Sequence, residues 1–383
     1  MRLLSTIVFA VGMCTSAATF AKTVTVGFIS SLSGPISSLG IPYANGVIAG
    51  HKAIGKSADA DIKLIRLDDA SDPATAARNA RKLINEDQVD VLMGTSGVPG
   101  TMAIAAVANE SKVPFIAISP VANVSPATAE WMVSVAQPTE LMINAVVDHM
   151  KAHGVKTVSY IGFSDAWGDL AYDALKKHAA QVGIELLNDE RYSRTDASVT
   201  GQMLKIRARK PDAILAGTSG TPAALPYLEL KKLGYKGKVY GTHGLINSDF
   251  IRVVGRAGDD ILAPTGPVTV AEQLPDANPV KRVALAYRDA FAAAFPKGTP
   301  DVFSAWSYDA WLLLVSATAE AQAHAEPGTP AYRQAVMEAI FRTHELAGTH
   351  GVYNYKRGSP FGTDERARVV VRLLGGKWKL ENE

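Results

Sequence analysis

Short apolar runs alternate with amphipathic stretches along most of the chain, and this alternation predicts the fold class. The runs are continuous and rich in β-branched residues, which is typical of strands buried on both faces. In the first part of the chain the predicted strands are 23–31, 61–67, 89–94 and 113–119, and the predicted helices are 41–54, 73–85 and 101–109. Such an alternation indicates a parallel sheet covered by helices.

The same alternation restarts after residue 130 and predicts a second unit. A linking strand at 131–136 leads into it, its own strands are 155–162, 185–191, 212–217 and 238–241, and its helices are 139–153, 169–182, 199–209 and 223–233. Two successive series of strands and helices predict two α/β lobes. The Pro-rich segment 264–279 is interpreted as a crossing or surface connection. The remaining elements are helices at 280–295, 303–325 and 331–341 and short strands at 353–356 and 367–374, which return to the two lobes.

The first 21 residues have the pattern of an export signal. A positive residue, Arg2, precedes an apolar run at 3–13, and small residues stand at 19 and 21, the two positions that a signal peptidase reads. This pattern predicts a cleavable signal peptide, with cleavage before Lys22 and a periplasmic protein as the result. A membrane anchor and a lipoprotein acylated at Cys14 are the alternatives. The broken apolar run disfavours the first, and the bulky residue before the cysteine disfavours the second.

Composition and charge exclude several classes of protein. A chain of 383 residues allows one to three domains, and a hydrophobic content of 47% excludes a disordered chain. Lys and Arg number 39 against 37 Asp and Glu, and this balance argues against a nucleic-acid partner. The single cysteine, Cys14, excludes an intramolecular disulfide and a cysteine-based zinc site.

Motifs for catalysis and cofactor binding fail on spacing. The glycines at 94, 97 and 100 follow a strand but lack the dinucleotide fingerprint, so we interpret them as turn residues. His344 and Glu345 begin a zinc-protease pattern whose second histidine is missing. His149 and His153 share a helix face, but no third ligand is close in the sequence. We therefore expect no catalytic residues, no metal site and no cofactor, and a protein that is not an enzyme.

Small polar residues gather where the predicted strands end, which is where open parallel sheets bind ligands. Each of them alone is explained as a helix cap or turn residue. As a set on both lobes, however, they predict a polar cleft between the lobes. The set is Ser31, Ser33, Gly34, Thr95, Ser96, Ser119, Asn123, Asp165, Trp167, Thr218, Ser219, Thr242, His243 and Gly244.

Five sequence motifs at these positions match a known family in combination. They are 26–29 with 32–35, the acidic segment 68–73, Gly94 with Thr101, the apolar segment 113–120, and Trp167 with Gly168. From residue 22 to about 379 the chain resembles the periplasmic solute-binding proteins of ABC transporters, in the branched-chain amino acid (Leu/Ile/Val) family. The resemblance implies two Rossmann-like lobes joined by a three-crossover hinge, the type I periplasmic-binding fold. It also implies a first lobe of 22–136 plus 266–348 and a second lobe of 137–265 plus 349–383.

The amino-acid pocket implied by the resemblance fits this chain poorly. Val98 stands where the family offers a serine hydroxyl, and Leu39 stands where it has a tyrosine. A carbonyl and a threonine of the family correspond here to Val121, Ala122 and Asn123, while an aromatic residue is kept as Trp167. The acid that pairs with the ligand ammonium is replaced by His243.

The change from an acid to a histidine alters the predicted ligand. A buried ammonium without an anionic partner is costly, and His243 is not an anion. A carboxylate suits His243 together with helix-start amides and the hydroxyls of Thr95, Ser96, Thr218 and Ser219. Apolar walls at Leu39, Val98 and Trp167 then indicate an aromatic or other hydrophobic organic acid. The segments 240–244 and 264–275 are also similar to a subgroup associated with aromatic acids.

The resulting hypothesis is the substrate-binding component of an ABC importer, a monomer that docks transiently on a membrane permease. Its mechanism is capture of a small carboxylate by hinge closure. Two alternatives stay open. The first is an amino-acid-binding transport protein, in which Asp165 turns inward to pair with an ammonium. The second is a ligand-sensing subunit that docks on a membrane receptor.

Overall fold

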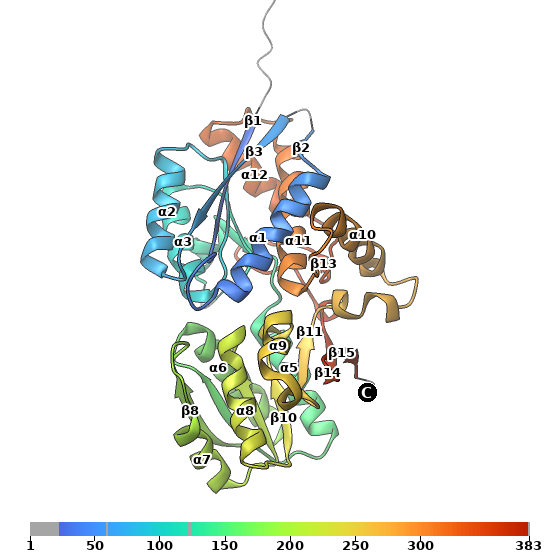
Figure 1. The fold of residues 1–383 in the computed structure, drawn as a ribbon. Coiled ribbons are helices and arrows are strands. Elements are labelled where there is room, and N and C mark those ends of the chain that lie inside the picture. The colour runs from blue at the N-terminus through green and yellow to red at the C-terminus, as the bar shows by residue number, and fades with distance from the viewer. Residues whose placement is uncertain (1–22, 59, 122–123, 382–383) are drawn as a thin grey trace, which may run out of the picture.

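The computed structural model describes residues 23–58, 60–121 and 124–381 and shows two lobes, one above the other in Figure 1. The predicted signal peptide lies outside the described residues. Within them, no helix combines the length and the apolar character needed to cross a membrane.

The first lobe is built on a six-stranded sheet in the order β2-β3-β1-β4-β5-β6, parallel except for β2. Its strands are β1 (Thr23–Ser30), β2 (Lys56–Ser57), β3 (Ala60–Asp68), β4 (Val91–Gly94), β5 (Phe115–Ala117) and β6 (Met132–Ser134). Its helices are α1 (Ser37–Ala53), α2 (Pro73–Asn85), α3 (Val98–Ser111), α4 (Pro126–Ala129), α10 (Pro279–Ala294), α11 (Val302–Ala321) and α12 (Pro330–Arg342).

Local signals explain how these helices begin and pack. Asp72 caps α2, because its side chain accepts a hydrogen bond from the Thr75 amide at 2.7 Å. Helices α1 and α11 lie side by side (Figure 1). They approach so closely that a Cβ added at Gly46 would lie 2.0 Å from the Ser304 carbonyl oxygen. Only glycine therefore fits at this crossing.

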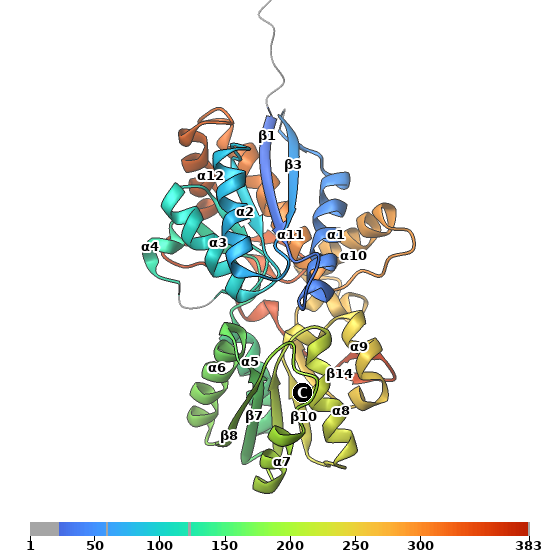
Figure 2. The same cartoon turned by 60° about the vertical axis from the view of Figure 1, so that its left-hand side comes forward.

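The second lobe has a seven-stranded sheet in the order β15-β14-β11-β10-β9-β7-β8. Strands β7 to β11 are parallel to one another, and β14 and β15 pair antiparallel. Its strands are β7 (Thr157–Phe163), β8 (Glu185–Tyr192), β9 (Ala213–Gly217), β10 (Lys238–Gly241), β11 (Leu262–Thr265), β14 (Val369–Leu374) and β15 (Lys377–Leu380). Its helices are α5 (Thr139–Ala152), α6 (Ala166–Val182), α7 (Thr200–Arg209), α8 (Ala224–Lys232) and α9 (Ser248–Val254). Figure 2 shows α5 and α6 to one side of this sheet.

Three chain segments connect the lobes: from β6 to α5, from β11 to the 3-10 helix η4 (Pro267–Gln273), and from β13 (Val352–Tyr353) to β14. Gln137 lies on the first of these segments and forms hydrogen bonds to the third segment and to the first lobe. Its Nε2 donates to the Ala367 carbonyl at 2.9 Å, and its Oε1 accepts from Trp306 Nε1 at 2.8 Å. At Gly266, on the remaining crossover, an added Cβ would lie 2.1 Å from His350 Nδ1. The predicted two-lobe α/β fold with a three-crossover hinge is confirmed.

The segment that follows β13 lies against the first lobe. The hydroxyls of Tyr353 and Tyr355 donate to the carbonyls of Val135 and Ser134 at 3.1 and 3.0 Å. The Ser134 amide donates to the Pro360 carbonyl at 2.6 Å. Strand β13 itself pairs with β12 (Leu346–Ala347). The lobe boundary at residue 349 stays a prediction.

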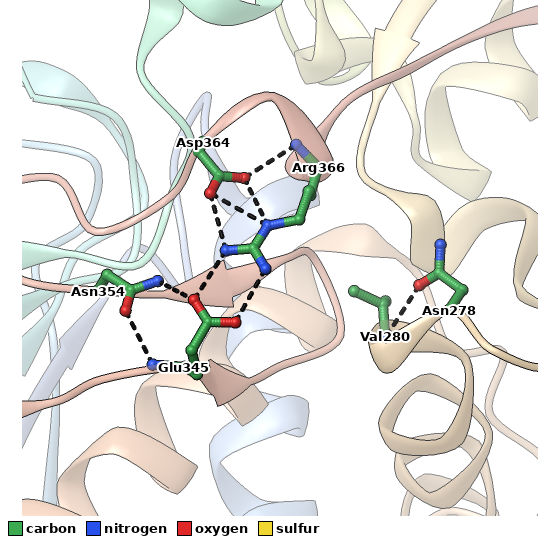
Figure 3. Close-up of polar contacts among 6 residues, drawn as sticks. All are labelled: Asn278, Val280, Glu345, Asn354, Asp364 and Arg366. Atoms are coloured by element: carbon green, nitrogen blue, oxygen red, sulfur yellow. Dashed lines mark hydrogen bonds and ion pairs between the residues drawn. The ribbon is translucent and has the colours of Figure 1, made fainter.

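An exposed charged cluster braces the third crossover (Figure 3). Arg366 donates to Glu345 Oε2 at 2.9 Å and to Asp364 Oδ2 at 2.8 Å. Asn354 donates to the other Glu345 oxygen at 2.8 Å. These hydrogen bonds, with that from Arg366 the largest, lower the pKa of Glu345 to about 2. The carboxylate is therefore ionised at neutral pH and fixes the segment after β13.

Candidate ligand-binding cleft

A cavity lies between the lobes, at the carboxyl ends of the parallel strands of both sheets. First-lobe residues reach it from α1, from the loops after β4 and β5, and from the start of α11. Second-lobe residues reach it from the start of α6 and from the loops after β8, β9 and β10. The side chains of the two lobes leave only a small space between them. A ligand held there is therefore a small molecule.

Many of the residues singled out in the sequence meet around this cavity. They are Leu39, Ser96, Val98, Ser119, Trp167, Ser219, His243 and Gly244. The two first-lobe hydroxyls among them are already bonded within their own lobe. Ser96 Oγ accepts from the Ser31 amide at 2.9 Å, and Ser119 Oγ lies 2.6 Å from Thr101 Oγ1. Their positions are thus fixed by the sheet and α3.

Two other predicted hydroxyls of the first lobe are directed to carboxylates and do not line the cavity. Ser33 is exposed, and its Oγ donates to Asp68 at 2.7 Å. Thr95 is buried and donates to the Asp69 side chain. Asp68 and Asp69, at the end of β3, therefore hold the loops that follow β1 and β4. Contact of Ser33 and Thr95 with a ligand stays a prediction.

Val121 and Thr218 are likewise absent from the lining. Val121 packs in the apolar core beside β5 and α3, since it leaves the sheet on the core side. Thr218 is fully buried, and its carbonyl accepts from Thr242 Oγ1 at 2.7 Å. Its role is to hold the neighbouring loop. Asn123 lies outside the described residues.

Trp167 and His243 bring unpartnered polar atoms to the cavity. Their side chains are 4% and 2% exposed, and their ring centroids are 5.2 Å apart. Trp167 Nε1 and both ring nitrogens of His243 have no hydrogen-bond partner among the described residues. Burial lowers the pKa of His243 to about 3. His243 is therefore neutral at pH 7, with one donor and one acceptor nitrogen, and Trp167 adds a second donor.

Arg194 adds the cation of the cavity and was missed by the sequence search. Its Nε donates to Asp165 Oδ2 at 2.6 Å and its Nη1 to Ser219 Oγ at 3.0 Å. Asp165 also accepts from the Trp167 and Gly168 amides, at 3.0 and 3.1 Å, as the cap of α6. Its charge is thereby compensated. Arg194 follows β8, so the strand-end rule would have found it had the search included long cationic side chains.

An aromatic wall from the first lobe completes the cavity. Tyr43 comes from α1, while Phe303 and Trp306 come from the first turn of α11 and its continuation. The Trp306 ring centroid lies 5.6 Å from that of His243. This role was not predicted, because α11 is buried along most of its length and its residues have the pattern of an ordinary core helix. No Asp or Glu lines the cavity in the part of the chain that the structure describes.

Comparison with known proteins settles the family. Residues 23–366 match the family model described as periplasmic binding protein. The chain is a type I periplasmic binding protein. It is 37% identical to an extracellular ligand-binding receptor from Rhodopseudomonas palustris, over 95% of this chain and 100% of that one, with a TM-score of 0.91. A search of curated proteins finds no match.

More distant structures share the fold of this binding protein. One is a solute-binding protein of an ABC transporter from R. palustris in complex with benzoate, 22% identical over 94% of this chain and 95% of that one, with a TM-score of 0.78. Another is a leucine-binding protein from Thermotoga maritima, 21% identical over 94% and 98%, with a TM-score of 0.81. The resemblance to periplasmic solute-binding proteins is confirmed, and that family consists of exported solute-binding proteins.

The lobes of this binding protein touch directly at the rim of the cleft. Pro42 lacks an amide hydrogen, so the Ser38 carbonyl in the first turn of α1 has no helical partner. Asn247 of the second lobe supplies one, donating from Nδ2 to Ser38 O at 2.6 Å. The Thr221 amide also donates to Ser38 Oγ at 3.3 Å. Hydrogen bonds to Ser38 thus join the two lobes directly, and we call this contact the latch.

Proposed function

We propose that this protein is the periplasmic substrate-binding component of an ABC importer and that it captures a small aromatic or hydrophobic carboxylate in its cleft. Binding involves no bond cleavage. The lobes close over the ligand, and the closed form then docks on the membrane permease. Membership of a family of exported solute-binding proteins supports the transport role.

The observation that carries the ligand class is the polarity of the lining. Trp167 Nε1 and His243 are buried without partners in the described chain, and Arg194 lies beside them. All three offer hydrogen-bond donors, while no carboxylate of the described residues lines the same space. A ligand carboxylate can accept hydrogen bonds from these donors. An α-ammonium would lie near the positive charge of Arg194 without an anionic partner, which is costly.

Apolar neighbours indicate the rest of the ligand. Leu39, Val98 and the aromatic wall surround the donors, and rings pack well edge-on or offset against such side chains. The benzoate complex of a structural neighbour shows that the fold is compatible with an aromatic acid. Because another structural neighbour is a leucine-binding protein, the experiment below also includes amino acids.

Two matched pairs of ligands test the proposal. 3-Phenylpropanoate and phenylalanine differ only by the α-ammonium group, as do 4-methylpentanoate and leucine. Each is titrated into the purified protein by calorimetry, with the melting temperature as a second measure, since a ligand of the native state raises it. We expect binding of the acids and at least about a hundredfold weaker binding of the amino acids. Tight binding of leucine or phenylalanine without binding of either acid would overturn the ligand class. Ser33→Ala, outside the cavity, is the control variant.

A further inference from the structure

Two histidines of α5 meet the C-terminal end of the chain on the outer side of the second lobe. The rings of His149 and His153 stack with centroids 3.9 Å apart. Glu381 directly follows β15, and its Oε1 lies 3.7 Å from His149 Nε2. One potential ligand atom from each of the three residues falls within 4.8 Å of the other two. Figure 1 shows α5 and the C-terminus on the same lobe, and none of the three residues lines the cleft.

Hydrogen bonds on the far side of each ring leave the Nε2 atoms free to act as ligands. His153 Nδ1 lies 2.8 Å from the His149 carbonyl, so this nitrogen carries the proton and donates. His149 Nδ1 lies 3.0 Å from the Tyr240 hydroxyl. His149 is 8% exposed, and its Nε2 has no hydrogen-bond partner in the described ranges. Metal-binding histidines are oriented by such outer hydrogen bonds.

A cation already lies beside the carboxylate of this cluster. Arg372 donates from Nε to Glu381 Oε2 at 2.9 Å and from Nη2 to Glu381 Oε1. Arg372 is therefore the group that competes with a bound metal ion for Glu381.

We propose that His149, His153 and Glu381 bind one divalent transition-metal ion, with Zn²⁺ the best match. Two imidazole nitrogens and one carboxylate oxygen are ligands that zinc accepts, and water completes a tetrahedral set. The ion would join the end of α5 to the residue after β15.

The test is a calorimetric titration of ZnCl2 into the purified protein, freed of metal with a chelator and carrying no polyhistidine tag. We expect one ion per chain, and His153→Ala and Glu381→Gln each to weaken its affinity by about tenfold or more. Both changed side chains lie at or near the surface, so the variants are expected to fold. The control is His324→Ala, which removes an exposed histidine elsewhere and leaves the affinity unchanged.

Co²⁺ provides an independent signature, because a tetrahedral site with nitrogen and oxygen ligands gives visible absorption that His153→Ala removes. Absence of saturable Zn²⁺ binding, or equal affinity in the wild type and His153→Ala, would overturn the proposal. The organic-acid proposal is tested separately, since 3-phenylpropanoate binding should be the same with and without Zn²⁺.

Discussion

His243 and His149 are both buried histidines of the second lobe, and each has at least one ring nitrogen without a hydrogen-bond partner among the described residues, but their neighbours differ. His243 stands between Trp167 and Trp306, in a space that no carboxylate of the described chain lines. His149 stands beside a second imidazole and Glu381. Burial keeps both rings neutral at pH 7, so the neighbouring groups decide the chemistry. One site is suited to an anion and the other to a cation.

The largest expected effect comes from giving the cleft the carboxylate it lacks. His243→Asp would place a buried anion beside the ligand carboxylate, and such like-charge contacts cost several kcal/mol. We expect 3-phenylpropanoate affinity to fall by more than about a hundredfold, while Zn²⁺ binding at His149 stays unchanged. Calorimetry measures both. Equal loss in His243→Phe, which adds no charge, would show that repulsion is not the cause.

Arg194→Met removes the cation of the cleft but keeps an unbranched side chain. A hydrogen bond to a charged group contributes about 1.5–3 kcal/mol, so we expect carboxylate affinity to fall by about ten- to a hundredfold. Asp165 would then keep only its two backbone donors, and the preference for 3-phenylpropanoate over phenylalanine should narrow. Arg252→Met, at an exposed pair with Asp249 on α9, is the matched control. An unchanged preference would show that Asp165 does not face the ligand.

Acid should destabilise the protein through its buried histidines. Burial lowers the pKa of His243 to about 3, against an ordinary value of about 6.5 in the unfolded chain. Between these values the unfolded state binds more protons, so the free energy of unfolding falls as the pH falls. The slope is at most about 1.4 kcal/mol per pH unit for each such group. Urea unfolding from pH 7 to 4.5 should show a smaller slope for His243→Phe than for the wild type. His344→Phe, at an exposed position, should match the wild type.

The sequence predicts elements where the signal is local. Helix α2 begins and ends as predicted, because Asp72 and Pro73 mark its start. Strand β11 was missed because Pro264 lies within it, and proline is unusual inside a sheet. Helix α1 begins at Ser37, four residues before its predicted start at Ile41. Its proline is tolerated because the freed Ser38 carbonyl bonds to the other lobe, a contact far away in the sequence.

The residues of the cleft were predicted only in part. The strand-end rule located His243 and Trp167, because parallel topology fixes where those loops lie. It does not tell which way a side chain turns, so Thr95, which turns to Asp69, was included. Phe303 and Trp306 come from a helix whose exposure to the cleft depends on how it packs against α1. The proposed zinc ligands could not be predicted for a similar reason. Glu381 lies more than two hundred residues from His153 in the sequence, and only the fold brings them together.

The smallest expected effect concerns the latch between the lobes. Asn247→Ala removes the donor to the Ser38 carbonyl, and one hydrogen bond contributes about 1 kcal/mol, so we expect about fivefold weaker 3-phenylpropanoate binding. Asn247 also caps α9, accepting from the Phe250 amide at 2.9 Å, so stability falls as well.

Asn278→Ala separates the two effects. Asn278 caps α10 through the Val280 amide at 2.9 Å (Figure 3). This control loses a helix cap but no latch, and its ligand affinity should equal that of the wild type. If both variants bind equally well, the Ser38 contact accompanies closure without stabilising it, and closure then depends on the ligand that bridges Arg194 and the aromatic wall.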